Sequence, residues 1–246
     1  MAVSIKSARE IELMREAGKR LAHVHQELEA MIAPGISTWE IDAKGEKLIR
    51  DCGFLHYNGY PASICVSVND EVVHGIPRKD RYLKEGDIVS LDAGLIYKGY
   101  HSDAARTHAV GKVSTEAQKL MDVTKQSFFE GIKMAKEGQH LHDISRAIEE
   151  YVTPYGYGIV RDLVGHGIGT ALHEDPQIPN YAQKRRGVRL QAGMTLAIEP
   201  MINAGTWQVR FLRDGWTVVT KDGSLSAHYE NTILVTDGEP EILTLY

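Results

Sequence analysis

Two stretches of the sequence carry histidines and carboxylates in the same order. The tripeptide His-Gly-Ile occurs twice, at His74–Ile76 and His166–Ile168. Each copy is followed by an acidic residue in an apolar run, and then by an acidic residue that ends a His-x-acid triplet. These groups are His74, Asp92 and Asp103 in the first half, and His166, Glu199 and Glu230 in the second. Chance placement of surface acids does not reproduce such an order, so the repeat indicates one shared site.

The repeat predicts a site at which carboxylates converge. If the two halves fold alike about a twofold axis, Asp92, Asp103, Glu199 and Glu230 meet near the axis beside His166. Carboxylates close together in an apolar environment repel one another and resist ionisation. Two divalent cations would cancel these charges, and oxygen ligands with one imidazole suit Mn, Fe or Co and are compatible with Zn. Two such ions activate water and polarise a carbonyl, which predicts hydrolysis of an amide or ester.

Other reactive side chains are interpreted as structural. His101 and His228 open the His-x-acid triplets, and strand alternation is expected to turn them to the face opposite the acids. Cys65 is expected to line a pocket or the core, because no catalytic base is identifiable near it. The sequence has no Gly-x-Ser-x-Gly motif for a serine nucleophile. Solvated helix faces or caps are expected for His23, His25, His140 and His142.

The elements that position the site repeat as well. In each half, two segments with helical spacing of apolar residues precede β-branched runs. Capping boxes at Ser7–Glu10 and Ser37–Glu40 begin the first two helices. Gly99 turns the chain between the strands of Asp92 and Asp103. We therefore expect an α+β fold in one domain, with pseudo-twofold halves of about residues 1–110 and 111–246 and helices covering one face of a curved sheet.

The composition is that of an ordinary globular chain. Its 246 residues are 43% hydrophobic and 25% charged, within the usual range. A formal charge of −5 gives no general electrostatic reason to bind nucleic acid. No apolar run is long enough to cross a membrane, no signal-peptide core follows Met1, and two cysteines make no disulfide framework. We expect a cytoplasmic monomer with neither a membrane partner nor sequence-specific binding to nucleic acid.

Four motif groups resemble those of type I methionine aminopeptidases, M24 metallopeptidases of the pita-bread fold. They are DAG…HSDAART, LVGHGIG…LHEDP, TLAIEPM and SAHYENT. The resemblance covers essentially the whole chain and is to the minimal bacterial form. It implies that Asp92 binds one divalent ion and that His166 and Glu199 bind the other, while Asp103 and Glu230 bridge both. It also implies removal of the initiator methionine from nascent polypeptides when the second residue is small.

The resemblance further implies roles around the metals. Glu199 would accept a proton from the attacking water and later help to protonate the leaving amine. His74 would contact the amide nitrogen of the scissile bond, and His173 would donate to the carbonyl oxygen as it becomes an oxyanion. The free α-amine of the substrate would bind the metal held by Asp92, which limits cleavage to the first residue.

A methionine pocket and a cation site are implied in the same way. The pocket residues would be Tyr57, Tyr60, Cys65, His74, Leu172, His173 and Trp216, with Phe54 close by. Leu172 stands where the family commonly has an aromatic residue, which would loosen the pocket. A structural Na or K ion would bind carbonyl oxygens of Asn69, Glu71 and Ser226.

Two alternatives use the same scaffold. An Xaa-Pro aminopeptidase or prolidase shares the ligands, but such proteins usually carry an additional N-terminal domain, and the first capping box here begins at Ser7. A non-catalytic pita-bread binding protein typically loses ligands, whereas this chain keeps all five and both auxiliary histidines. Separately, the basic cluster Lys184–Arg186 with Arg189 could contact ribosomal phosphates near the exit tunnel, or be a solvated loop.

Overall fold

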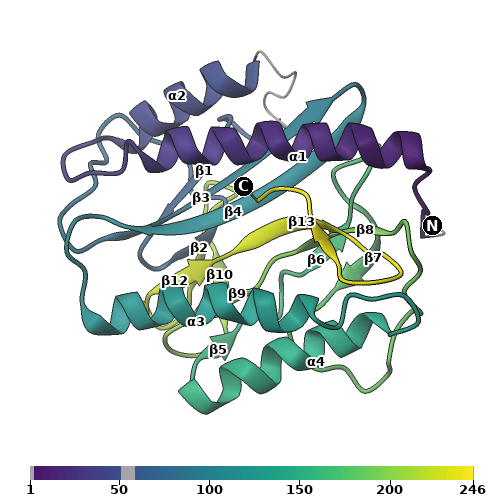
Figure 1. Ribbon diagram of the computed structural model, residues 1–246. Coiled ribbons are helices and arrows are strands. Elements are labelled where there is room, and N and C mark those ends of the chain that lie inside the picture. Colours follow the sequence, from purple (N-terminus) through teal and green to yellow (C-terminus); the bar gives the residue numbers. More distant parts are fainter. Residues whose placement is uncertain (1–2, 51–58, 246) are drawn as a thin grey trace.

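Two pairs of helices cover one face of a curved antiparallel sheet in the computed structural model (Figure 1), which describes residues 3–50 and 59–245. The helices are α1 (Ala8–Glu29), α2 (Thr38–Arg50), α3 (Thr115–Ile132) and α4 (Leu141–Val152), followed by a short 3-10 turn, η2 (Thr153–Tyr155). Each half therefore contributes one long and one shorter helix, as the sequence predicts.

The main sheet has eight strands in the order β1-β3-β4-β13-β8-β6-β7, with β14 also pairing with β13. All of these pairs are antiparallel. The strands are β1 (Cys65–Val68), β3 (Ile88–Tyr97), β4 (Tyr100–Ala109), β6 (Gly165–Gly167), β7 (Glu174–Ile178), β8 (Thr195–Ile198), β13 (Glu230–Leu234) and β14 (Glu241–Ile242).

Two smaller sheets flank the main one. One has the order β10-β11-β2, and the other has the order β12-β9-β5. Their strands are β2 (Glu71–Val73), β5 (Gly158–Ile159), β9 (Met201–Asn203), β10 (Val209–Phe211), β11 (Val218–Thr220) and β12 (Ser226–His228).

The pairing of β4 with β13 joins the two halves at the centre of the main sheet. Strands β1, β3 and β4 come from the first half, and β13, β8, β6 and β7 come from the second. This arrangement confirms the α+β prediction and brings the repeated motifs to one central region. The boundary between the halves near residue 110 stays a prediction.

Each half has its own apolar core beneath its helices. Leu21 and Leu28 of α1 pack with Leu91 of β3, whereas Phe128 of α3 packs with Ile233 of β13. Burial of large apolar side chains on one stripe of each helix is the main force that holds the helices to the sheet.

The start of α1 is fixed by the predicted capping box. The Ser7 hydroxyl accepts a hydrogen bond from the Glu10 amide, and the Glu10 carboxylate accepts one from the Ser7 amide at 2.7 Å. These bonds from Ser7, with one from Tyr100, lower the pKa of Glu10 to about 2. The capping box thus sets where the N-terminal segment leaves the helix.

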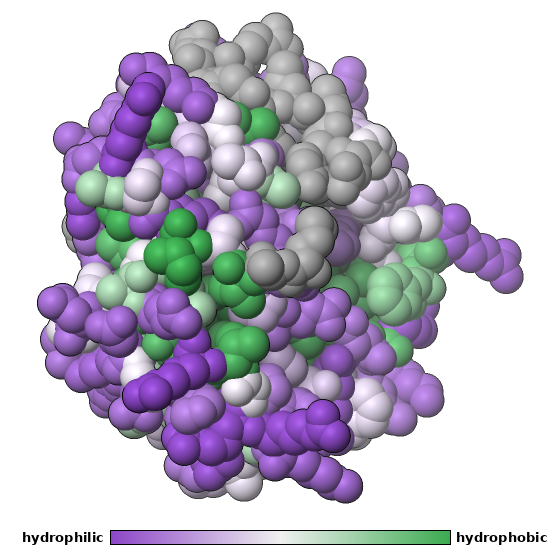
Figure 2. All heavy atoms as spheres, turned by 90° about the vertical axis from the view of Figure 1, so that its right-hand side faces the viewer, coloured by the Kyte–Doolittle hydropathy of each residue, from purple (hydrophilic) through white to green (hydrophobic). Residues whose placement is uncertain are grey.

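The surface is hydrophilic over most of the face shown in Figure 2, with hydrophobic side chains gathered near its middle. None of the described helices combines the length and the apolar character needed to cross a membrane.

Candidate metal centre and active site

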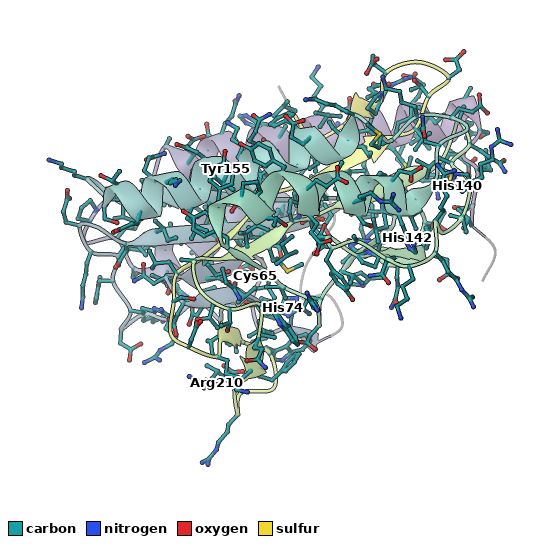
Figure 3. The ribbon with its side chains drawn as sticks, turned by 90° about the horizontal axis from the view of Figure 1, so that it is seen from below. Cys65, His74, His140, His142, Tyr155 and Arg210 are labelled. Carbon is teal, nitrogen blue, oxygen red and sulfur yellow. The ribbon has the colours of Figure 1, made fainter. Side chains whose placement is uncertain are left out.

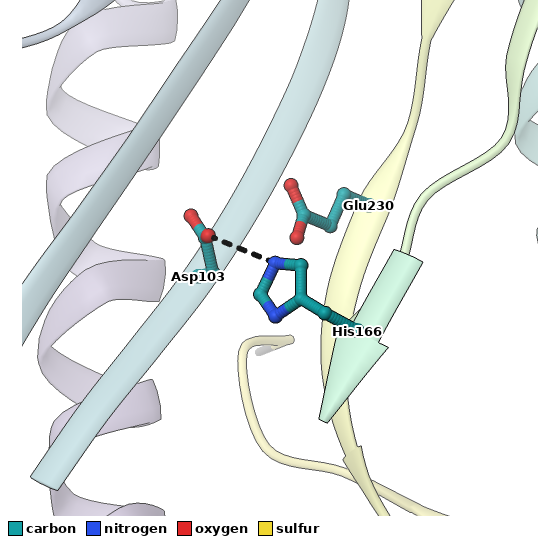
Figure 4. A group of neighbouring side chains, drawn as sticks. All are labelled: Asp103, His166 and Glu230. Atoms are coloured by element: carbon teal, nitrogen blue, oxygen red, sulfur yellow. Dashed lines mark ion pairs between the residues drawn. The ribbon is translucent and has the colours of Figure 1, made fainter. Parts of the chain in front are cut away.

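Asp103, His166 and Glu230 form a compact group of possible metal ligands (Figure 4). One ligand atom from each residue lies within 4.8 Å of the other two. The three side chains are buried and come from β4, β6 and β13, strands that are distant in sequence. Antiparallel pairing at the centre of the sheet therefore assembles residues from both halves at one point.

The remaining two predicted ligands lie beside this group. His166 Nε2 is 3.6 Å from Glu199 Oε1 and 3.8 Å from Asp103 Oδ2. Asp92 on β3 raises the pKa values of Asp103 and Glu199 through its charge, so it lies within their electrostatic reach. The structure thus brings together the five residues that were predicted to converge as metal ligands.

The charge state of this cluster fits divalent cations. Burial raises the pKa of Asp92 to about 7, and burial together with the neighbouring carboxylates raises the pKa values of Asp103, Glu199 and Glu230. Burial and the nearby His173 lower the pKa of His166 to about 4, so its imidazole is a neutral ligand. Among the described residues, no lysine or arginine forms an ion pair with these carboxylates, and Glu230 Oε1 has no hydrogen-bond partner.

The predicted orientation of His228 is wrong. His228 Nε2 lies 3.9 Å from a carboxylate oxygen of Glu199 and 3.9 Å from one of Glu230, and neither ring nitrogen has a hydrogen-bond partner within residues 3–50 and 59–245. Residues two apart on a strand share a face, so the His-x-acid spacing itself indicates that the histidine approaches the acids. Burial, with the charges of His74 and Arg106, lowers the pKa of His228 to about 3 and keeps it neutral.

The same correction applies to His101, and a related one to His25. The buried His101 lies within electrostatic reach of His173 and Glu174, and it is two residues before Asp103 on β4, so the two side chains share a face of the strand. His25 is buried rather than solvated, and its Nε2 lies 2.9 Å from the Ala104 carbonyl oxygen. Its position four residues after Leu21 and three before Leu28 places it on the apolar stripe of α1.

His140 and His142 lie away from the candidate site (Figure 3). His140 is the N-cap residue of α4, and its amide donates to the Asp143 carboxylate at 3.0 Å. This confirms the interpretation of His140 as a cap.

The two auxiliary histidines flank the carboxylate cluster. The His173 and His166 rings meet edge to face with centroids 4.4 Å apart. His74 has a left-handed backbone, with φ 58°, and its ring centroid lies 6.5 Å from that of Trp216. Burial lowers the pKa of both His74 and His173, so both rings are neutral near pH 7 and each can donate one N–H.

A cavity of about 180 Å³ adjoins the cluster and includes two of its carboxylates in its wall. The lining residues are Tyr60, Ala62, Ser63, Cys65, His74, Asp92, Gly94, Asp103, Leu172, His173 and Trp216. Six of the seven predicted pocket residues are among them, and Cys65 and His74 are labelled in Figure 3. Tyr57 and the neighbouring Phe54 lie outside the described residues. A larger groove of about 830 Å³ beside the start of α3 contains none of the buried carboxylates.

Aromatic contacts shape the wall of this cavity. Tyr60 and Trp216 meet edge to face with centroids 5.3 Å apart, and the Tyr60 hydroxyl donates to the Gly75 carbonyl oxygen at 2.7 Å. Cys65 pairs across the sheet with Asp92, and burial, with the charge of Asp92, raises the pKa of its thiol. A neutral thiol is a poor nucleophile, which supports the interpretation of Cys65 as a pocket residue.

The residues predicted to hold a monovalent cation already take part in hydrogen bonds. The Ser226 amide donates to the Asn69 carbonyl oxygen at 2.8 Å, and Asn69 has a left-handed backbone, with φ 60°. The Glu71 carboxylate accepts hydrogen bonds from the Val68 amide and from Arg81. A Na or K site at Asn69, Glu71 and Ser226 stays a prediction.

Comparison with known proteins gives a consistent result over the whole chain. Residues 12–237 match the model of metallopeptidase family M24. A methionine aminopeptidase of Clostridium acetobutylicum is 53% identical over 247 residues, which cover 99% of each chain. The crystal structure of methionine aminopeptidase from Thermotoga maritima matches with a TM-score of 0.96 at 46% identity over 100% of both chains.

The rival proline-specific branch is more distant. An Xaa-Pro dipeptidase from Bacillus anthracis matches with a TM-score of 0.77 at 26% identity, over 98% of this chain and 61% of that chain. The chain therefore belongs to the M24 metallopeptidase family, within its methionine aminopeptidase group.

Proposed function

We propose that this protein hydrolyses the first peptide bond of polypeptides that begin with methionine and have a small second residue. The observation that carries the proposal is the shared wall between the cavity and the carboxylate cluster. Asp92 and Asp103 line the same 180 Å³ cavity as Tyr60 and Trp216. A side chain held in this cavity would place its own backbone at the cluster, where hydrolysis would take place.

The five clustered residues would hold two divalent ions, of Co, Mn, Fe or Zn. Asp92 would bind one ion, His166 and Glu199 would bind the other, and Asp103 and Glu230 would contact both. When bound, such ions supply an activated water and polarise the scissile carbonyl. Burial and mutual repulsion raise the pKa values of these acids in the free protein, and the positive charge of the ions would offset both effects.

The neighbouring side chains would move protons and stabilise charge. The Glu199 carboxylate would accept the proton of the attacking water and return one to the leaving amine. His173 would donate its N–H to the carbonyl oxygen as negative charge develops there, and His74 would contact the amide nitrogen. Both histidines are neutral near pH 7, which leaves one N–H on each ring for these contacts.

The cavity wall suits the methionine side chain. Tyr60, Trp216, Leu172 and Cys65 present aromatic, aliphatic and thiol surfaces, which make favourable contacts with a flexible thioether.

A set of three peptides tests the proposal. The metal-stripped protein should be silent on peptides that begin with Met-Ala, Met-Lys or Ala-Pro. Added Mn or Co should restore release of methionine from the Met-Ala peptide alone. Cleavage of the Ala-Pro peptide instead would indicate the proline-specific branch. A folded protein that binds no metal and cleaves none of the peptides would be the non-catalytic binding protein.

We further infer that the protein works as a cytoplasmic monomer on chains that emerge from the ribosome. Within the basic cluster of Lys184–Arg186 and Arg189, Lys184 and Arg185 are exposed, whereas the Arg186 guanidinium is paired with Asp143 at 2.7 Å. Lys184 and Arg185 are therefore more available to phosphate than Arg186 is.

Replacing both Lys184 and Arg185 with glutamine should reduce co-sedimentation with ribosomes several-fold at low salt, since phosphate contacts are electrostatic and screened by salt. The matched control replaces the exposed Lys19 and Lys47 with glutamine. Equal co-sedimentation of the two double variants would remove the basic loop as a ribosome contact.

A further inference from the structure

The segment before α1 packs against the turn between β6 and β7. The Lys6 side chain is only 5% exposed, and its ammonium lies 2.6 Å from Glu174 Oε2. The Ser4 hydroxyl donates to the same oxygen at 2.8 Å, and the Lys6 amide donates to the Gly193 carbonyl at 2.8 Å. A partly buried ion pair thus links the N-terminal segment to residue 174, which is 168 positions away in the sequence.

The Glu174 carboxylate connects this segment with the turn at residues 169–173. Its other oxygen, Oε1, accepts hydrogen bonds from the Ala171 amide at 3.2 Å and from the Thr170 hydroxyl at 3.4 Å. Burial alone would raise the pKa of Glu174, but hydrogen bonds from Lys6 and Ser4 outweigh it and the pKa lies below its ordinary value. The carboxylate is therefore ionised and bonded on both sides.

The Lys6 stem also lies directly against the backbone of the turn. A Cβ atom at Gly169 would be 2.5 Å from Lys6 Cε and 2.6 Å from Glu174 Oε1. On the other side, the Gly169 carbonyl accepts a hydrogen bond from the His101 amide at 2.7 Å. The turn is thus held between the sheet and the Lys6 side chain.

This turn carries two residues of the candidate active site. Leu172 and His173 line the 180 Å³ cavity, and the His173 ring contacts that of His166. We propose that Lys6 is a positioning residue, whose ion pair with Glu174 fixes the turn and thereby places the His173 imidazole and the Leu172 wall at the active site. The inference rests on the proposed role of His173.

The Lys6→Gln variant tests the proposal in the full-length, metal-loaded protein. We expect kcat for the Met-Ala peptide to fall between about tenfold and about a hundredfold, because small displacements of a catalytic group are costly. KM should change less than kcat, since the His173 contact strengthens only in the transition state. Stabilisation by added Mn should change little, because none of the five proposed ligands lies within the turn at residues 169–173. Lys6→Arg should recover part of kcat.

The matched control is Lys44→Gln, which removes a lysine–glutamate pair of 2.8 Å between α2 and α1, with Glu27. This variant should keep the kcat of the unmodified protein. If Lys6→Gln does not fold, Glu174→Gln takes its place in the test. This variant removes the same charge attraction and keeps the shape of the side chain. An unchanged kcat in the folded variant would overturn the proposal, as would an equal loss of kcat in Lys44→Gln.

A double variant and hydrogen exchange separate this inference from the role of His173. In a His173→Ala background, Lys6→Gln should cause little further loss of kcat, and a full additional loss would show that Lys6 does not act through His173. If His173→Ala alone keeps full activity, the proposed role of His173 is wrong. The link from Lys6 through Glu174 to the turn is still tested by hydrogen exchange of the Ala171 amide. That exchange should be faster in Lys6→Gln, and unchanged protection would refute the link.

Discussion

Asp103→Ala should abolish the metal-dependent release of methionine from a Met-Ala peptide. Asp103 belongs to the tightest group of candidate ligands and would contact both ions, so its removal leaves neither ion fully held. Turnover should fall by more than about a hundredfold. A fall of about a hundredfold is already the upper range for removing a residue that hydrogen-bonds a metal ligand without binding the metal itself. Turnover of the peptide and the metal content of the purified variant are the measurements.

The stability of the variant distinguishes loss of the site from loss of the fold. Asp103 is one of several buried acids with raised pKa values, so its removal from the metal-free protein relieves repulsion. The melting temperature of the metal-free variant should therefore be no lower than that of the unmodified protein. Asp237→Ala, at an exposed loop position, is the control and should keep full turnover. Asp103→Ala protein with substantial turnover would remove Asp103 from the set of bridging ligands.

The second large effect is expected from metal itself. An ion that binds only the folded state stabilises it by about 4 kcal/mol at a thousand times its dissociation constant. For a chain of this size, that corresponds to a rise of about 8 to 16 °C in the melting temperature. Melting curves of metal-stripped protein with increasing Mn test this, and Asp103→Ala should show a much smaller rise. A melting temperature that is independent of Mn would argue against a metal site.

The pH dependence of this stabilisation follows from the raised carboxylate pKa values. Burial raises the pKa of Asp92 from 3.8 to about 7, so the folded metal-free protein holds protons that the unfolded chain has released. Between these values the unfolded state binds fewer protons at Asp92, so the contribution of this carboxylate to the stability of the metal-free protein should fall as the pH rises, whereas the buried histidines with lowered pKa values contribute in the opposite direction below their ordinary pKa. Metal replaces those protons, so the rise in melting temperature with Mn should be larger at pH 8 than at pH 5. A rise in melting temperature with Mn that is no larger at pH 8 than at pH 5 would contradict this account.

Much of the fold was predictable because its signals are local in the sequence. Ser7 and Glu10 are three residues apart, and a capping box of this spacing can bond within one turn of helix. The order of His74, Asp92 and Asp103 is repeated by His166, Glu199 and Glu230, which indicated one site without any knowledge of how the strands pair. The resemblance to type I methionine aminopeptidases added the pocket residues, which neither periodicity nor spacing could provide.

The errors in the sequence predictions have different causes. For His228, the rule of strand alternation was applied to the wrong pair of residues. For His25, packing outweighed the expectation from residue type. His228 approaches Glu230 because side chains two residues apart in extended backbone point to the same side, although the alternation argument assigned His228 to the other side. His25 resembles a solvated helix residue by type, but it occupies the apolar stripe of α1 and is buried against β4.

The sequence by itself determined which chemical groups the protein has, their order, and the helices and strands that carry them. Only the tertiary structure decided which of those groups are buried together, and therefore that four acids have raised pKa values while the neighbouring histidines are neutral. It alone also decided that Lys6 meets Glu174. The physical reason is that desolvation and long-range contacts depend on which segments pack against each other, and local spacing does not specify that packing.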